Sequence, residues 1–234
     1  MTTSEAARRF PWSLTLAVIP AMALLIGLGV WQVQRLYWKE GLIARSEAAA
    51  TMPTAPLAQV IAQGHAEFRR VTVDCPGLAT APWIEMQTVQ DGEVGVRLIS
   101  ACLVGGTTYL VDRGFVAETV SARPLTSPAA DPFRLEAVVR TPPAANRMAP
   151  PQQDRLFFTR NASAMARALG ATTPIAPQTL FAVTSTNPEW QALKPSVPPV
   201  AFENNHLGYA ATWFGLALAL LGFYAAMVLR RMKP

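Results

Sequence analysis

The sequence predicts a membrane protein in which two transmembrane α-helices, one near each end, flank a β-rich α+β domain outside the cytoplasm. Two long runs without a charged residue, over 10–34 and 207–229, predict the helices. Between them, short stretches of alternating apolar and polar residues, separated by most of the 20 prolines, predict strands and turns. We expect the strands to form a small antiparallel barrel or sandwich.

Each charge-free run is longer than the roughly 20 residues that an α-helix needs to cross the apolar core of a bilayer. For the first run the alternative is a cleavable signal peptide, because Arg8 and Arg9 precede it. The run exceeds the apolar region of such a peptide, and bulky side chains rather than a small-residue cleavage site close it. We therefore predict an uncleaved helix that continues out of the membrane and ends before Pro53.

The charges beside the second run predict the orientation. Arg230, Arg231 and Lys233 follow it directly, and positive residues beside a span favour the cytoplasmic side. Both termini should then be cytoplasmic, in a bacterial inner membrane whose lipid contacts both helices. The predicted order is a cytoplasmic segment (1–10), a transmembrane helix (11–33), a periplasmic β-rich domain (34–205), a second transmembrane helix (206–229) and a cytoplasmic tail (230–234).

Local signals predict the elements of the middle segment. Strands are predicted over 68–75, 82–89, 94–104, 107–116, 132–141, 155–160 and 179–186. Gly105 and Gly106 suit a tight hairpin turn, because both central positions of such a turn need a positive φ. Asn161 is the predicted N-cap of a helix over 162–170, and a shorter helix is predicted within 52–64.

Charge and cysteine usage restrict the function. The net charge of +5 and the isoelectric point near 9.7 are compatible with a nucleic-acid partner. The basic residues do not cluster beyond the membrane flanks, however, so no nucleic-acid partner is predicted. Cys75 and Cys102 lie in apolar, strand-like surroundings, where a disulfide and two small buried thiols both remain open.

The middle segment carries no pattern typical of an enzyme. It lacks a nucleophile elbow, a phosphate-binding loop and a zinc-binding HExxH motif. His65 is expected on a solvated surface, and Asp112 with Arg113 is expected to form an ion pair or a brace of a turn. We therefore predict no catalytic residue, and a membrane-anchored enzyme is the weakest alternative.

Polar and aromatic side chains gather at the outer edges of the two predicted spans. Residues at helical spacing share a face in each span: Trp31, Gln34, Arg35 and Trp38 in the first, and His206, Tyr209, Ala210 and Trp213 in the second. An ordinary belt of interfacial aromatic residues explains most of them. His206 is not a typical belt residue, and two interpretations of it remain open. It can bond a backbone carbonyl at the start of the helix, or it can be the axial ligand of a haem whose propionates contact Arg35.

The sequences at the outer edges of both predicted spans also resemble those of a known protein family. The first edge reads GLGVWQVQRLYWKEGLIAR and the second reads NNHLGYAATWFGLALALLGFY. Together they resemble the two signatures of the surfeit-locus family of cytochrome c oxidase assembly factors. Three middle stretches occur in that family's order: FRRVTVDCPG, GVRLISACLVGGTTYLVDRGFV and FFTRNASAMARALG.

The resemblance implies a factor that helps to build the haem-copper oxidase. Such a factor would bind haem a transiently and pass it from haem a synthase towards oxidase subunit I. The family histidine falls on His206, the expected haem ligand, and Trp31, Gln32 and Arg35 match the family residues after the first span. Tyr209 and Trp213 are expected beside the cofactor. The alternative is a cofactor-free membrane scaffold that stabilises an early intermediate of oxidase assembly.

Overall fold

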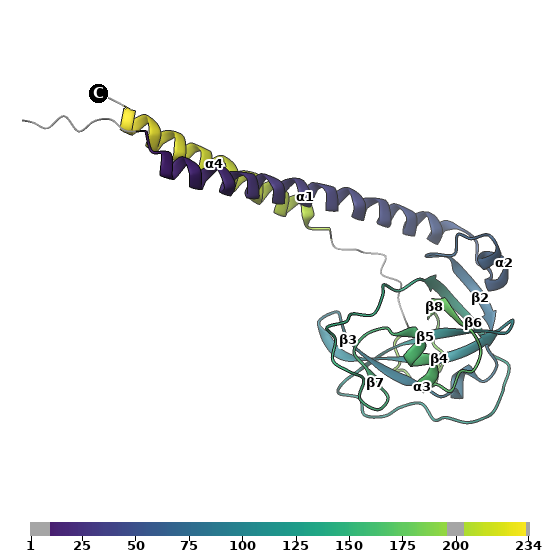
Figure 1. Cartoon of the computed structure of the whole chain (residues 1–234). Helices are drawn as coiled ribbons and strands as arrows, with labels where there is room; N and C mark the ends of the chain where they lie inside the picture. The colour runs from purple at the N-terminus through teal and green to yellow at the C-terminus, as the bar shows by residue number, and fades with distance from the viewer. Residues whose placement is uncertain (1–9, 196–203, 233–234) are drawn as a thin grey trace, which may run out of the picture. The chain divides into compact units, whose positions relative to one another are not determined.

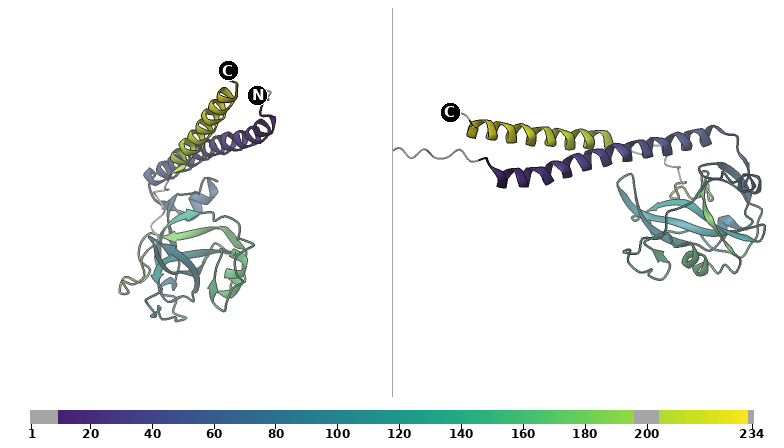
Figure 2. Two further views of the ribbon diagram at one scale, coloured as in Figure 1. Left: turned by 90° about the vertical axis from the view of Figure 1, so that its left-hand side faces the viewer. Right: turned by 45° about the horizontal axis from the view of Figure 1, so that its top comes forward.

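The computed structural model describes residues 10–195 and 204–232 of the chain (Figure 1). The chain divides into two compact units, which are described separately. One unit contains 1–44 and 201–234 and is built from two long helices, and the other contains 45–200 and is built around a β-sheet (Figure 2). The predicted class, two terminal apolar helices flanking a β-rich α+β domain, is confirmed.

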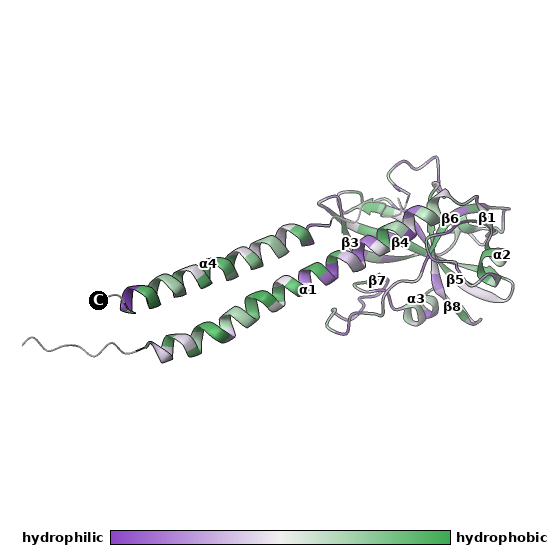
Figure 3. Cartoon of the chain, turned by 90° about the horizontal axis from the view of Figure 1, so that it is seen from above, coloured by the Kyte–Doolittle hydropathy of each residue, from purple (hydrophilic) through white to green (hydrophobic). Residues whose placement is uncertain are grey.

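Helix α1 extends over Trp12–Thr51 without interruption. Its 40 residues correspond to a length of about 60 Å at 1.5 Å per residue, twice what an apolar bilayer core requires. The apolar residues occupy its first part and the charged residues follow, as the colouring in Figure 3 shows. The predicted continuation beyond residue 33 is therefore correct, and the helix ends just before Pro53.

Helix α4 extends over His206–Met232. Arg230 and Arg231 occupy its last turn, where positive charge is favourable beside the unpaired carbonyl groups of a helix end. Both α1 and α4 are long and apolar enough to cross a membrane. The predicted pair of candidate spans is therefore present.

The two helices run antiparallel. The Thr15 and Tyr224 hydroxyls are 2.7 Å apart near one end of the pair, and Gln32 contacts His206 near the other. The less exposed side chains recur at alternating spacings of three and four, as in a coiled-coil seam. They are Thr15, Val18, Met22, Leu25, Gly29 and Gln32 in α1, and His206, Ala210, Trp213, Ala217, Leu220 and Tyr224 in α4.

Gly29 is the point of closest approach in this seam. A Cβ atom at Gly29 would lie 2.6 Å from the ring of Phe214. At Gly27, half a turn away, a Cβ atom would meet nothing within 4 Å. The absence of a side chain at Gly29 therefore lets α4 pack directly against the backbone of α1.

The β unit contains one mixed sheet with three short helices. The strands are β1 (Ala55–Pro56), β2 (Arg70–Asp74), β3 (Ile84–Gln90), β4 (Glu93–Val104), β5 (Thr107–Ala117), β6 (Arg134–Arg140), β7 (Leu156–Phe157) and β8 (Ile175–Ala182). The helices are α2 (Leu57–Ala62), the 3-10 helix η1 (Leu78–Thr80) and α3 (Ala162–Ala168). Asn161 caps α3 through its Oδ1, which accepts from the Ala164 N–H at 3.0 Å, as predicted.

The strand order across the sheet is β1-β2-β6-β8-β5-β4-β3-β7. The hairpin β4–β5 turns at Gly105 and Gly106, whose φ angles of 55° and 79° confirm the expected turn. The prediction of a wholly antiparallel arrangement is wrong at three pairs, because β1–β2, β3–β7 and β5–β8 are parallel. The β5–β8 pair is parallel because the chain passes through β6, β7 and α3 before β8 joins the centre of the sheet.

A disulfide joins Cys75, just after β2, to Cys102 in β4. Three strands, β6, β8 and β5, lie between β2 and β4 in the sheet order, yet the two Cα atoms are 5.5 Å apart. The sheet must therefore curl until β2 and β4 face each other. The enclosed apolar core includes Val71, Leu135 and Leu180, and both cysteines are buried in it. Of the two alternatives that the sequence left open, a disulfide and two buried thiols, the structure therefore has the disulfide.

Candidate functional site

His206 is the first residue of α4, and its ring contacts Gln32 of α1. The distance between His206 Nδ1 and Gln32 Oε1 is 2.7 Å. Gln32 is only 9% exposed, and His206 is half-buried. A buried side-chain amide thus holds the only histidine that the structure places in the helix unit.

With the Gln32 amide oriented so that Oε1 faces the ring, Nδ1 is the ring nitrogen that carries the proton. A carbonyl oxygen such as Oε1 only accepts hydrogen bonds, so Nδ1 of His206 donates. In the neutral ring the proton then lies on Nδ1, and the lone pair lies on Nε2. Histidines that bind metals in proteins commonly donate their other ring N–H to an oxygen acceptor in this way. The arrangement therefore leaves Nε2 suited to a metal centre.

The structure corrects which face of α1 meets α4. Trp31 and Trp38 are 53% and 49% exposed, and Arg35 is exposed beside them, with its guanidinium 3.8 Å from the centre of the Trp38 ring. These residues lie off the seam, because one residue along a helix corresponds to a rotation of about 100°. Gln32, on the adjacent face, makes the contact instead.

The other predicted residues of α4 divide in the same way. Trp213 is half-buried on the seam, two turns from His206, whereas Tyr209 is 58% exposed. The alternative in which His206 bonds a backbone carbonyl at its own helix start is not observed, since its partner is a side chain of α1. The alternating spacing that ends in Gly29 and Gln32 was the signal in the sequence that could have identified this face.

The β unit contains a buried arginine, Arg113, on β5. Its guanidinium donates to the Ala79 carbonyl at 2.8 Å and to Thr186 Oγ1 at 3.0 Å. It also bonds Ser100 Oγ and Asn187 Oδ1. Burial lowers the pKa of Arg113 to about 10, and the charge of nearby Glu189 opposes that shift. These bonds satisfy the buried charge and tie η1 and the 186–187 turn to the sheet.

Asp112 points to the opposite side of β5 and has different partners. Its Oδ2 accepts from Arg97 Nε at 2.7 Å and from Arg160 Nη2. Both guanidinium groups also lie over the ring of Phe181 on β8. The expected ion pair thus exists for Asp112 but not with Arg113, because neighbouring side chains of a strand point to opposite faces.

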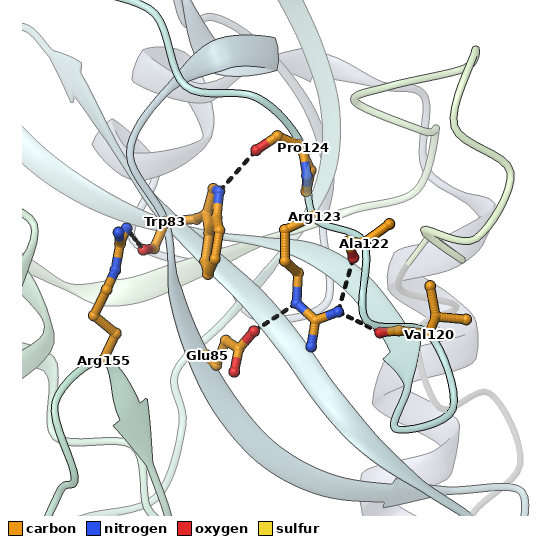
Figure 4. Close-up of polar contacts among 7 residues, drawn as sticks. All are labelled: Trp83, Glu85, Val120, Ala122, Arg123, Pro124 and Arg155. Atoms are coloured by element: carbon orange, nitrogen blue, oxygen red, sulfur yellow. Dashed lines mark hydrogen bonds and ion pairs between the residues drawn. The ribbon is translucent and has the colours of Figure 1, made fainter.

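A third polar cluster lies where two long loops meet the start of β3 (Figure 4). Trp83 Nε1 donates to the Pro124 carbonyl at 3.2 Å, and the Arg155 guanidinium lies 4.5 Å from the centre of the Trp83 ring. Arg123 pairs with Glu85 at 2.5 Å and donates to two carbonyls of its own loop. These contacts anchor the loops, so we assign the cluster a structural role.

Metal-binding side chains do not gather elsewhere in the structure. Across residues 10–195 and 204–232, no three His, Cys, Asp or Glu side chains lie close enough to hold a metal ion. A single histidine can still bind a metal that brings ligands of its own, such as the iron of a haem. His206 offers one ring nitrogen for that purpose, because its other ring nitrogen contacts Gln32.

Comparison with known proteins identifies the family. The sequence model of the SURF1 family matches residues 19–218, a range that contains Gln32, the whole β-sheet and His206. The chain belongs to the SURF1 family. A SURF1-like protein of Drosophila melanogaster is 27% identical over 238 residues, which cover 92% of this chain and 77% of the relative.

Other SURF1 relatives show similar likeness. Surfeit locus protein 1 of Homo sapiens is 29% identical over 233 residues, covering 87% of this chain and 73% of the relative. A relative in Saccharomyces cerevisiae, named as the cytochrome oxidase assembly protein SHY1, is 28% identical over 193 residues. Those residues cover 76% of this chain and 49% of the yeast protein. The SURF1 assignment agrees with the resemblance seen at both membrane edges.

Proposed function

We propose that this protein is an assembly factor for a haem-copper oxidase, that it binds haem a at His206, and that it passes this cofactor to oxidase subunit I. The family assignment and the name of the yeast relative, a cytochrome oxidase assembly protein, support the assembly role. The observation that carries cofactor binding is the bond between His206 Nδ1 and Gln32 Oε1, and no hydrogen bond of Nε2 is present among residues 10–195 and 204–232. Haem a synthase is the proposed donor of the cofactor.

Each residue of the site has a distinct task in this proposal. Bound haem would supply an iron that takes an imidazole nitrogen as axial ligand. His206 offers Nε2, and Gln32 holds the ring in place from the seam. Arg35 is the proposed partner of a propionate, because its guanidinium is exposed at the end of the apolar part of α1. Trp31, Tyr209 and Trp213 offer the flat apolar surfaces that a porphyrin requires.

A carrier has to bind and release its cofactor but need not catalyse a reaction, so we propose that the protein is not an enzyme. A final oxidase site must hold the cofactor more tightly than its carrier does, since otherwise transfer would not proceed. One histidine, half-buried at the end of a helix pair, provides one axial ligand. That arrangement suits transient binding.

We also propose that α1 and α4 span a bacterial inner membrane, with both termini in the cytoplasm and the β unit in the periplasm. Arg230 and Arg231 at the end of α4 support this orientation. The disulfide between Cys75 and Cys102 supports it as well, because such bonds persist in oxidising compartments.

A spectrum of the purified protein tests the proposal. The full chain is co-expressed with the enzymes of haem a synthesis and purified in mild detergent, and its reduced-minus-oxidised spectrum is recorded. We expect a haem a signal in the parent protein and its loss in His206→Gln, which keeps a hydrogen-bond donor towards Gln32 but removes the imidazole. Tyr224→Phe, which breaks the other polar contact of the helix pair, is the matched control and should keep the signal.

The cofactor-free scaffold is the second candidate function, and the seam itself favours it. A polar pair in an apolar seam can fix the register of two helices without binding any ligand. The pair of Gln32 and His206 meets that description, and the small residues Ala210 and Ala217 permit close packing. A parent protein that purifies without haem under the conditions above, and a His206→Gln variant that still supports oxidase assembly, would favour the scaffold.

A further inference from the structure

A cavity of about 280 Å³ opens in the β unit, on the side of the sheet that carries α3. Leu110 of β5 and Met165 of α3 provide one apolar wall. Pro142, Pro143 and Pro177 provide another. None of the anchoring contacts of the helix pair lies here, so this cavity is separate from the proposed haem site.

The wall over 142–145 is fixed at both ends. The Thr141 N–H donates to Glu67 Oε2 at 2.7 Å, and the Asn146 N–H donates to Thr159 Oγ1 at 2.9 Å. Two consecutive prolines between these anchors restrict the backbone further. A preformed wall lowers the conformational entropy that a ligand must overcome on binding.

Arg160 lies at one end of the cavity. Its Nη2 donates to the fully buried Asp112, and its guanidinium lies 4.8 Å from the centre of the Phe181 ring. Across the described residues, its guanidinium makes no other hydrogen bond. A guanidinium group carries five N–H donors, and the bond to Asp112 uses one of them.

Arg160 is the charged residue among the described residues that line the cavity, and Glu67, which anchors the wall beside it, is paired with Arg140. No Asp or Glu is among the described residues that line the cavity. Arg167 follows the lining residue Ser163 by one helical turn, and Arg147 follows the anchor Asn146 directly. Both arginines are exposed, so the positive charge extends beyond the cavity itself. Such a surface favours a ligand that continues past the cavity over a single small acid.

We propose that this cavity binds an acidic peptide segment of a partner protein. One carboxylate contacts the guanidinium of Arg160, and an adjacent aliphatic side chain packs against the wall that Leu110 and Met165 form. Charge-assisted bonds from arginine to a carboxylate are among the stronger polar contacts in proteins, and they are directional. The proposal does not depend on haem binding.

Fluorescence anisotropy with labelled peptides tests this site on the full chain in detergent. The probe is fluorescein-Gly-Gly-Asp-Leu-Gly-amide, and its matched partner carries Asn in place of Asp. We expect binding of the Asp peptide to be at least about tenfold tighter than that of the Asn peptide, since one lost charged contact of about 1.4 kcal/mol is a factor of ten.

Two variants distinguish peptide binding in the cavity from binding elsewhere on the surface. Ala145→Trp should fill the cavity without touching Asp112, and should weaken binding about tenfold or more. Ala168→Trp, on the exposed side of α3 and outside the cavity, should bind as the parent does. Arg160→Lys keeps the charge but loses the planar fork, and is expected to bind more weakly than the parent.

Three outcomes would overturn the proposal. The first is equal binding of the Asp and Asn peptides, and the second is unchanged binding by Ala145→Trp. The third is displacement of the peptide by free isovalerate at equal concentration, which would assign the cavity to a small acid instead of a partner segment.

Discussion

At the residue scale, the bond between Gln32 and His206 determines what the helix pair can do. A histidine whose Nδ1 is engaged presents a single defined nitrogen, and a buried amide keeps that nitrogen in one place. Oxygen acceptors of this kind orient the ligands of many metal sites and increase their basicity. Gln32 is therefore a positioning residue for the proposed haem site.

Gln32→Leu should weaken haem binding by about ten- to a hundredfold, the usual effect of losing such a partner. Gln32→Glu keeps an acceptor for Nδ1 and should retain the cofactor with a lower midpoint potential. The measurements are a haem titration and a redox titration of the purified variants. Gln34→Leu, at an exposed position of α1, is the matched control. Haem affinity in Gln32→Leu equal to that of the parent would contradict the positioning role.

Among the charged residues of the β unit, Arg113 is the one whose substitution we expect to lower the free energy of unfolding most. In Arg113→Met the hydroxyl oxygens of Ser100 and Thr186 lose their donor, and the Ala79 carbonyl and Asn187 Oδ1 each lose one of two donors. We expect the free energy of unfolding to fall by about 3 kcal/mol or more, as for other broken buried polar networks.

Urea unfolding followed by near-ultraviolet circular dichroism measures this effect on the full chain. The control is Arg134→Met, because Arg134 pairs with Asp74 on an exposed surface where ion pairs contribute little. Similar urea midpoints for the two variants would show that the bonds of Arg113 do not stabilise the fold as described.

At the element scale, the seam between α1 and α4 depends on small residues where the helices approach most closely. Gly29 lies directly under Phe214, and Ala210 and Ala217 are almost fully buried. Hydrophobic association is weak inside a bilayer, where lipid is as apolar as the side chains. Packing and the polar pairs must therefore hold these elements together.

Gly29→Leu should separate the helix pair, whereas Gly27→Leu should not. Of these two glycines, only Gly29 has a neighbour within 4 Å of a new Cβ atom. Cysteines replacing Thr15 and Tyr224, whose hydroxyls are in contact, report the separation. We expect efficient oxidative cross-linking in the parent background and with Gly27→Leu, and a several-fold loss with Gly29→Leu. Equal cross-linking in both would show that the close approach at Gly29 is not required.

Local signals in the sequence predicted most elements, whereas long-range contacts escaped prediction. Asn161 and Gly105 mark a helix start and a turn through their own chemistry, so the sequence alone located them. The contact between Gln32 and His206 depends on two segments far apart in the chain, and the face of each helix could be found only once both were paired. Arg113 was expected beside Asp112 because sequence neighbours do not reveal which side of a strand is buried.

At the scale of the whole molecule, each unit contains one of the two proposed sites. The helix unit contains the proposed cofactor site, and the β unit contains the cavity proposed for an acidic segment. One of the two connections between the units is helical, because α1 crosses their boundary without a break. A client protein and its cofactor would therefore bind to different parts of one chain.

Loss of the disulfide should weaken the β unit as a whole. Replacing both Cys75 and Cys102 by Ala removes a link that spans 27 residues, and such links commonly stabilise a fold by about 2–4 kcal/mol. We expect a lower urea midpoint for the double variant and for the parent protein under reductant. A reductant effect on the double variant equal to that on the parent would show that the thiols are not the cause.

The same bond has a consequence for the order in which the protein matures. In the folded unit the bond links β2 and β4 across the three strands β6, β8 and β5 that lie between them in the sheet order. Strand β8 is synthesised last of the three, so the native surroundings of the bond are complete only once nearly the whole β unit has been made. A thiol-trapping time course during synthesis would show whether the two cysteines oxidise before or after that point.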